Sequence, residues 1–148
     1  MALAMACDIR IAAESAFLTT GYRNVALSGD YGISWMLTQL VGTSKARELM
    51  FTAERVKAAD ALRIGLVNKV VADADLQQAA FDMARDMASG PAAAMAAMKD
   101  NLEDALTIGY DTALDREAER LVPLSAHPDH HEAVRAFVEK RKPVFNKG

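Results

Sequence analysis

The chain has 148 residues, a formal net charge of −3 at pH 7 and an isoelectric point near 5.6. This slightly acidic balance excludes the basic surface typical of nucleic-acid-binding proteins, and a hydrophobic content of 51% excludes wholesale disorder. Charged residues interrupt the longest apolar runs well before membrane-spanning length. A single cysteine allows no internal disulfide and is typical of a reducing, cytoplasmic environment.

The first part of the chain combines an apolar start with two short segments that favour β-structure. Residues 1–6 have no N-cap and are typical of the last turns of a buried helix rather than of a helix start. Residues 9–13 and 16–20 follow, joined by a turn at Glu14 and Ser15. We expect both segments to be strands within a larger sheet.

Two helices are predicted next, with a glycine between them. Residues 33–41 are strongly apolar at helical spacing, and Gly42 is expected to close this helix as a C-cap. Thr43 or Ser44 is expected to cap a second helix that runs through Met50.

The remaining pattern predicts one short helix, one strand and a long helical region. Residues 58–64 are expected to be helical and residues 66–71 to form a buried strand. From residue 73 onward the pattern is helical, with a change of helix at Gly90-Pro91 and a last helix that begins at Pro128.

The sequence therefore predicts an α/β protein with two parts. Residues 1–71 contain the strands, and residues 72–148 contain amphipathic helices with small, alanine-rich faces. Those faces allow a close partner surface. The helices either cover a core of their own or pack against another subunit, and the residues leave both possibilities open.

The candidate active site is the segment 28–32, SGDYG, which precedes the helix beginning at Ile33. It places Asp30 at the mouth of a helix, where backbone amides are unpaired and a substrate could dock. Beside Tyr31 and Trp35 the carboxylate would lose water, which would suit a general base near neutral pH. The alternative is that Asp30 is a plain N-cap.

Several blocks of sequence, in their order and spacing, resemble the crotonase superfamily of enoyl-CoA hydratases and isomerases. They are residues 3–17 (LAMACDIRIAAESAF), 40–42 (LVG), 45–49 (KAREL), 58–71 (AADALRIGLVNKVV) and 136–145 (AFVEKRKPVF). The resemblance covers essentially the whole chain, but only the C-terminal portion of a family member. It implies that residues 1–71 are the end of a ββα spiral core and that residues 72–148 form a helical region for trimerisation and CoA binding.

A family member would carry far more chain before Met1, including two loops whose backbone amides hold the thioester oxygen. Because residues 1–6 would bury a face whose partners are absent, we expect a truncated gene, with a genuinely short relative as the alternative. We therefore expect the chain alone to show little enoyl-CoA turnover and to self-associate.

The resemblance also bears on the chemistry. Family hydratases use two glutamates, and Ala2 and Tyr22 stand at those positions here, whereas Asp30 matches a carboxylate position of some isomerases and of the related dehalogenases. Moving a double bond needs one base, while adding water needs a base and an acid. We therefore favour isomerisation with Asp30 as general base. The alternatives are a hydratase that uses Asp30 with an unidentified second acid, and a truncated, non-catalytic oligomerising remnant.

Further site residues are expected around the substrate. Tyr22, Tyr31 and Trp35 are predicted to contact the acyl-CoA substrate. Phe137 and Lys140 would share one helix face, and the resemblance implies that they bind the CoA nucleotide. The alternative is a buried Phe137 and a solvated Lys140.

The predicted partners are an acyl-CoA thioester and further copies of the chain, as a homotrimer or hexamer, with no nucleic acid and no membrane. No cofactor is expected, because CoA is part of the substrate.

The three histidines form an apparent cluster near the last helix. Adjacent residues on a helix point about 100° apart, and His127, His130 and His131 lack convincing ligand spacing, so no metal site is predicted. His127 is expected to belong to the turn that opens the helix.

Overall fold

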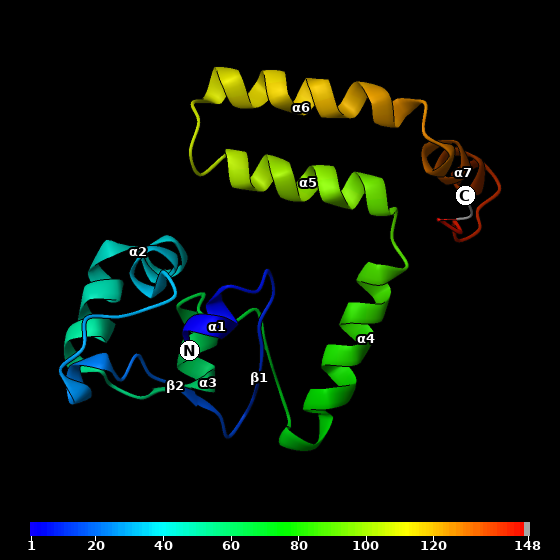
Figure 1. Cartoon of the computed structure of the whole chain (residues 1–148). Helices are drawn as coiled ribbons and strands as arrows, with labels where there is room; N and C mark the ends of the chain where they lie inside the picture. Colours follow the sequence, from blue (N-terminus) through cyan, green and yellow to red (C-terminus); the bar gives the residue numbers. More distant parts are fainter. Residues whose placement is uncertain (147–148) are drawn as a thin grey trace. The chain divides into compact units, whose positions relative to one another are not determined.

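The computed structural model describes residues 1–146 (Figure 1). The chain forms two compact units, Met1–Phe81 and Asp82–Gly148, and the division falls inside helix α4 (Leu76–Ala88). The first unit therefore continues beyond Val71, where the sequence predicts the division. One tertiary contact of the first unit lies just beyond Val71, where the Asp73 carboxylate accepts a hydrogen bond from the Ser15 backbone N–H at 3.0 Å.

The strands of the first unit pair across long sequence separations. Strand β1 (Ile11–Ala13) lies parallel to β4 (Lys69–Val71), and β2 (Phe17–Leu18) lies antiparallel to β3 (Val56–Lys57). Both N-terminal strands were expected, but the prediction of one larger sheet is wrong for residues 1–146, which contain two two-stranded sheets. The sequence analysis missed β3, because two residues are too few to show an alternating pattern.

The helices of the first unit largely follow the predicted pattern. They are α1 (Ala2–Met5), α2 (Ile33–Thr52) and α3 (Ala58–Arg63), with 3-10 turns η1 (Tyr22–Val25) and η2 (Asp73–Asp75). The predicted break at Gly42 is confirmed, since this residue has φ 77° and ψ 164° and interrupts α2. Only glycine adopts that backbone geometry at little cost.

The core of the first unit lies between its helices and the segment before β4. Its largest fully buried side chains are Ile33, Leu37, Leu49 and Leu66. Ala58 and Ala61 of α3 are also fully buried, and their small side chains allow the helix to pack closely. Burial of these apolar side chains is the main stabilising contribution in this unit.

One buried cation completes this core. Arg10 is only 8% exposed, and its Nε and Nη1 donate to the carbonyl oxygens of Leu66 and Cys7 at 2.9 and 2.6 Å. Its backbone N–H donates to the Asn68 side chain at 2.9 Å. The guanidinium thus ties the end of α1 to the segment that leads into β4.

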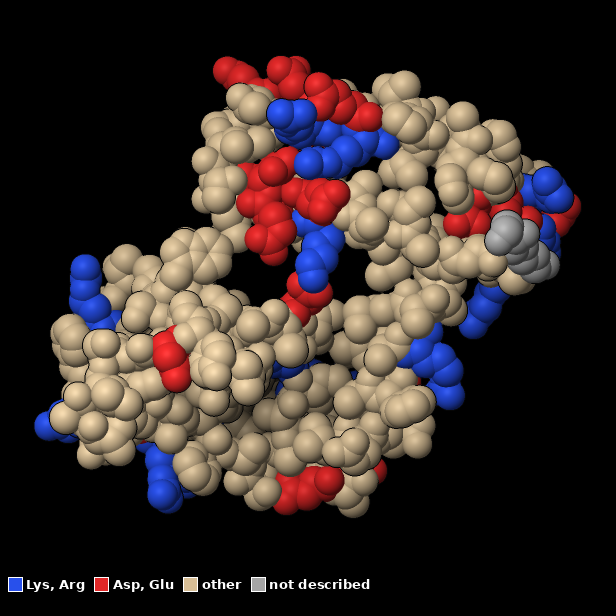
Figure 2. All heavy atoms as spheres, in the orientation of Figure 1, with Lys and Arg blue, Asp and Glu red and all other residues tan. Residues whose placement is uncertain are grey.

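The second unit contains helices α5 (Ala92–Asp104), α6 (Tyr110–Ser125) and α7 (Pro128–Val138), with α5 and α6 side by side (Figure 1). The predicted change of helix at Gly90-Pro91 and the start at Pro128 are confirmed. Within the described residues, α4, α5 and α6 bury no side chain fully. Figure 2 shows acidic and basic side chains interleaved over α5 and α6, and Arg120 pairs with Asp104 between these helices at 2.7 Å.

The helices of residues 1–146 include no candidate for a membrane-spanning segment. None of the helices described there has both the length and the apolar character to cross a bilayer.

Candidate active site

The loop that carries Asp30 has an unusual backbone. Four of its residues adopt positive φ: Ala26 at 55°, Gly29 at 130°, Tyr31 at 47° and Gly32 at 72°. A Cβ atom on Gly29 would meet the Ile33 side chain at 3.0 Å, so the loop lies tightly against the start of α2. Left-handed geometry at a residue other than glycine costs about 1–2 kcal/mol. Such strain concentrates at functional sites.

Asp30 is not the N-cap of α2, so that alternative is wrong. Gly32 occupies the N-cap position, and no side chain caps the helix there. The backbone carbonyl of Asp30 accepts a hydrogen bond from the Ile33 N–H at 3.0 Å. The carboxylate is consequently available for other contacts.

That carboxylate accepts a hydrogen bond from the Tyr22 hydroxyl. The structure therefore brings together two of the predicted site residues, which lie on η1 and on the loop before α2. The hydrogen bond to Asp30 raises the pKa of the Tyr22 hydroxyl, because a tyrosinate could no longer donate to it. Tyr22 itself is half-buried, with its ring packed against the core.

The prediction that Tyr31 and Trp35 shield the Asp30 carboxylate from water is wrong for the described residues 1–146. Asp30 is exposed, and the neighbouring rings of Tyr31 and Trp35 are 71% and 52% exposed. These side chains therefore leave the carboxylate open to solvent rather than enclosing it. All three still lie in or beside the same loop, which is where the sequence analysis places them.

The structure corrects the predicted arrangement of Phe137 and Lys140. Helix α7 ends at Val138, and Lys140 has φ 53°, so the two residues do not share a helix face. The N–H groups of Lys140 and Arg141 donate to the carbonyls of Phe137 and Ala136 at 3.2 and 3.0 Å. This pattern is a Schellman motif, with Lys140 in the left-handed position that glycine usually occupies. Phe137 is 85% exposed, so the alternative of a buried ring is also wrong.

Polar contacts fold residues 139–146 back onto α7. Arg141 binds both carboxylate oxygens of Glu132 at 2.5 and 3.1 Å, and the Val144 N–H donates to Glu132 at 3.1 Å. These contacts lower the pKa of Glu132 to about 2, with the Arg141 hydrogen bond as the largest cause. We call residues 139–146 the C-terminal strap.

Asn146 attaches the end of this strap to two helices. Its backbone N–H donates to Asp129 of α7 at 2.9 Å, and its side-chain amide donates to the Gly90 carbonyl at 2.8 Å. The Ala92 N–H at the start of α5 donates to the same side chain at 3.2 Å. The sequence analysis missed Glu132 and Asn146, because partners so far apart in sequence leave no local pattern.

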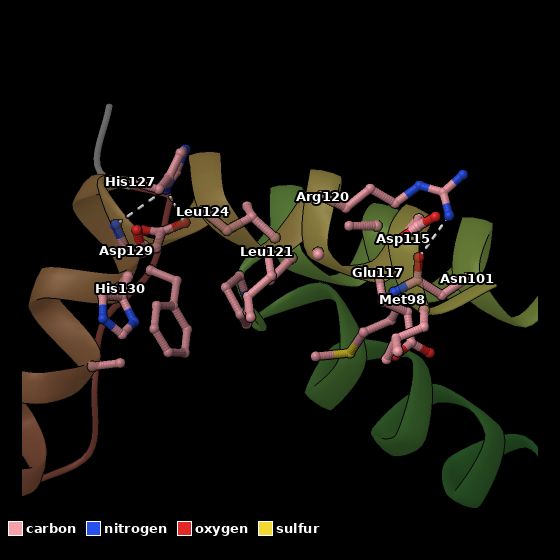
Figure 3. A pocket seen from close by; sticks show the side chains of 18 residues that line it. Met98, Asn101, Asp115, Glu117, Arg120, Leu121, Leu124, His127, Asp129 and His130 are labelled. Atoms are coloured by element: carbon pink, nitrogen blue, oxygen red, sulfur yellow. Dashed lines mark hydrogen bonds and ion pairs between the residues drawn. The ribbon is translucent and has the colours of Figure 1, made fainter. Parts of the chain in front are cut away.

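The second unit also contains an apolar groove of about 760 Å³ between α5, α6 and α7. In Figure 3 the side chains of Met98 and Leu121, from facing helices, extend into this space. Arg120 donates to Asn101 at 2.6 Å near one end. Its lining is mainly apolar and includes Pro91, Ala94, Ala97, Leu114, Ala118, Leu124, Ala133 and Phe145.

Of the histidines near α7, His127 caps the helix, and His130 and His131 are exposed. The prediction for His127 is confirmed, since this residue is the N-cap of α7 and its Nδ1 accepts from the Asp129 N–H at 3.2 Å. Among residues 1–146, no three side chains of the types that bind metals lie close enough to hold an ion together.

Comparison with known proteins identifies relatives of the whole chain. The short-chain-enoyl-CoA hydratase of Clostridium acetobutylicum is 37% identical over 140 residues, which cover 95% of this chain and 54% of that protein. The 1,2-epoxyphenylacetyl-CoA isomerase of Escherichia coli is 34% identical over 145 residues, covering 97% and 55%. This chain thus spans about half the length of the curated relatives it matches.

Solved structures agree with this result. A putative enoyl-CoA hydratase/isomerase from Mycobacterium abscessus has a TM-score of 0.95 at 34% identity, covering 98% of this chain and 56% of that one. An enoyl-CoA hydratase from Bacillus anthracis has a TM-score of 0.93 at 32% identity, covering 99% and 57%. The family model for enoyl-CoA hydratase/isomerase matches residues 1–148. The chain therefore belongs to the enoyl-CoA hydratase/isomerase family of the crotonase superfamily, which its sequence resembles.

Proposed function

We propose that this chain contributes to an enzyme that moves a double bond in an enoyl-CoA thioester, with Asp30 as the general base. The observation that carries the proposal is the state of the Asp30 carboxylate. It does not cap α2, it is exposed, and it accepts a hydrogen bond from the Tyr22 hydroxyl. Membership of the family supports an acyl-CoA substrate.

A single carboxylate is sufficient for this reaction. Asp30 would take a proton from C2 of a 3-enoyl thioester and return it at C4, which moves the double bond to C2–C3. In the reverse direction it would take the proton from C4 of the 2-enoyl thioester and return it at C2. The dienolate formed in between needs hydrogen-bond donors at its oxygen, and each such donor contributes about 3 kcal/mol or more. Proton transfer of this kind requires no cofactor beyond the CoA of the substrate.

We place residues 1–71 at the end of the family's spiral core, in the C-terminal portion of the fold. The strands and the Asp30 loop lie within this part. The amides that hold the thioester oxygen would then come from other residues of the fold. A single cysteine, Cys7, supports a cytoplasmic location.

The second unit supplies the proposed contacts with the CoA nucleotide. Phe137 offers an exposed ring that can stack on adenine, and Lys140 offers an ammonium group that can meet a phosphate. The Schellman motif fixes the backbone between the two residues. Within residues 1–146 no ion pair engages the Lys140 ammonium, so its charge is free for a phosphate.

We also propose that α4, α5 and α6 pack against further copies in a homotrimer or hexamer. These helices bury no residue of their own within the described part of the chain. They expose large apolar side chains, among them Met98 at 58%, Leu102 at 70% and Leu121 at 67%. Apolar stripes of this kind mark surfaces that another protein chain covers.

Hydration is the second candidate function, because the relatives include proteins named as hydratases. Asp30 would then act with a second acid that remains to be identified. A non-catalytic, oligomerising protein is the third candidate, supported by the same exposed apolar helices.

Two proteins test these proposals. The first is the chain alone. The second is the C. acetobutylicum hydratase with its matching segment exchanged for residues 1–148, which supplies the rest of a family member. Both are incubated with 3-enoyl-CoA and 2-enoyl-CoA in deuterated water. We expect the exchanged protein to isomerise the 3-enoyl substrate faster than it hydrates the 2-enoyl substrate, with deuterium entering at C2 or C4.

Asp30→Asn supplies the decisive comparison. Asparagine is nearly the same size but cannot take the proton, so kcat should fall by about 10²–10⁴-fold while the fold and CoA binding persist. Faster hydration, abolished by the same substitution, would favour the second candidate. A folded, CoA-binding protein without either activity would favour the third.

A further inference from the structure

We propose that Tyr22 is a positioning residue whose hydroxyl holds one oxygen of the Asp30 carboxylate and leaves the other oxygen free to accept the substrate proton. This inference rests on the proposed function of Asp30. It adds a role for Tyr22 that differs from contact with the substrate.

Tyr22 is well placed to hold another side chain still. Its ring packs against the core of the first unit, and its backbone carbonyl accepts a hydrogen bond from the Leu27 N–H at 3.0 Å. Gly21 before it has φ 73°, and the Asn24 N–H donates to the Gly21 carbonyl at 3.1 Å. The hydroxyl therefore projects from a short 3-10 turn that is fixed on both sides.

Asp30, by contrast, lies on an exposed loop. An exposed aspartate samples several rotamers unless a hydrogen bond selects one. The Tyr22 hydroxyl donates to Oδ1, and within residues 1–146 no hydrogen bond engages Oδ2. The arrangement assigns different tasks to the two oxygens, since only Oδ2 can take up a proton without losing the Tyr22 contact.

The protonation state of the Tyr22 hydroxyl is consistent with this role. The Tyr22 hydroxyl is a donor throughout the neutral pH range at its ordinary pKa of 10.0, and the hydrogen bond to Asp30 raises that pKa further. The hydrogen bond would thus persist wherever a carboxylate base is useful. A base held in one orientation reacts faster than a mobile one, and a misplacement of about 1 Å can cost about 10²-fold in rate.

Nuclear magnetic resonance on the 148-residue chain tests the pair without requiring turnover. Tyrosines labelled with ¹³C at the ring carbon that bears the hydroxyl are titrated from neutral to alkaline pH. We expect Asp30→Ala to lower the pKa of Tyr22 toward 10.0, because it removes both the acceptor and the charge. Ser28→Ala, an exposed change in the same loop, should leave the Tyr22 titration as it is in the parent chain.

The reciprocal measurement follows the ¹³C signal of the Asp30 carboxyl carbon. Tyr22→Phe retains the ring and its packing but removes the donor, so this signal should shift at neutral pH while the melting temperature changes little. Tyr110→Phe, in the second unit, should leave it in place. A Tyr22 titration that Asp30→Ala does not alter, or an Asp30 signal that Tyr22→Phe does not move, would overturn the inference.

These outcomes are separate from those that test the proposed function. If the titrations couple Tyr22 to Asp30 but no isomerase activity is found, the proposed function fails and the positioning contact stands. If Asp30→Asn abolishes isomerisation but the titrations are independent, Asp30 remains the base and Tyr22 has no positioning role.

Discussion

The two units of the chain are stabilised in different ways. Residues 1–81 enclose a core in which Ile33 and Leu37 are almost completely buried, whereas among the described residues of the second unit only Ala136 reaches that degree of burial and Asp129 is 8% exposed. The second unit instead contains partly exposed ion pairs such as Arg141–Glu132 and Arg120–Asp104, which contribute little to stability. A closed core stabilises a unit by itself, but exposed apolar helices need a further surface to cover them.

The residues of the proposed function are also divided between the two units. The general base and its positioning residue lie in the first unit, and the proposed nucleotide contacts lie in the second. Changes in the first unit should therefore act on kcat or on core stability. Changes in the second unit should act on KM for CoA thioesters or on assembly.

The largest expected effect comes from a pair of matched leucine substitutions. Leu37 is fully buried in the first unit and Leu121 is 67% exposed in the second. Leu37→Ala should lower the free energy of unfolding by about 2–5 kcal/mol, because it leaves a cavity in the core. Leu121→Ala should change it by less than about 0.5 kcal/mol.

Denaturant titration followed by Trp35 fluorescence measures this difference in the first unit. Analytical ultracentrifugation of the same two variants measures assembly, where Leu121→Ala should weaken self-association. If Leu37→Ala and Leu121→Ala lowered the free energy of unfolding equally, the second unit would have a closed core of its own, contrary to this comparison.

A smaller effect is expected from Tyr22→Phe in the protein with the exchanged segment. If Tyr22 orients Asp30, kcat for isomerisation should fall by about 10-fold with little change in KM. The effect should disappear in a background that already carries Asp30→Asn, because the two residues act as one unit. A change in KM alone would instead indicate that Tyr22 contacts the substrate.

Lys140 allows binding and stability to be separated. Lys140→Gly relieves left-handed strain of about 1–2 kcal/mol, partly offset by about 0.5–1 kcal/mol from the larger conformational entropy of glycine. It should therefore raise the free energy of unfolding by up to about 1 kcal/mol. The same change should raise KM for CoA thioesters but not for pantetheine thioesters, which lack the nucleotide. Lys140→Gln keeps the strain but removes the charge, so it should raise KM without the gain in stability.

The smallest effect concerns acid stability of the C-terminal strap. The pKa of Glu132 is about 2 in the folded chain against an ordinary 4.5, so its contribution to stability is complete above 4.5 and is lost as the pH falls through 2. Urea midpoints measured by circular dichroism between pH 5 and pH 2 should show this loss. Glu132→Gln should reduce the pH dependence, and adding Arg141→Gln should reduce it little further.

The elements predicted correctly share a local cause. Gly42 interrupts α2, Pro128 begins α7, and Gly90-Pro91 separates α4 from α5. Each signal depends on the backbone chemistry of one or two residues, so a sequence pattern is enough to reveal it. The identity of Asp30 as an uncommon carboxylate in a glycine-rich turn is likewise visible without a structure.

The errors have a non-local cause. The larger sheet expected for the first unit is replaced by two small sheets, because β1 pairs with β4 and β2 pairs with β3 across long stretches of sequence. The sequence pattern continues the last helix through Lys140, but α7 ends at Val138. Beyond that point the chain turns back, and Arg141 bonds Glu132, nine residues earlier. Such contacts join residues too distant to produce a periodic pattern.

The sequence by itself determined the family, the order of most elements and the position of the candidate base, because these depend on local composition and spacing. Only the tertiary structure decided what the base contacts. The pairing of Asp30 with Tyr22 arises because Tyr22 packs against the core, while Gly29 holds the strained loop close to Ile33 of the same core. Eight positions along the chain separate these two residues, and chain folding, rather than any helical or strand period, brings the hydroxyl to the carboxylate.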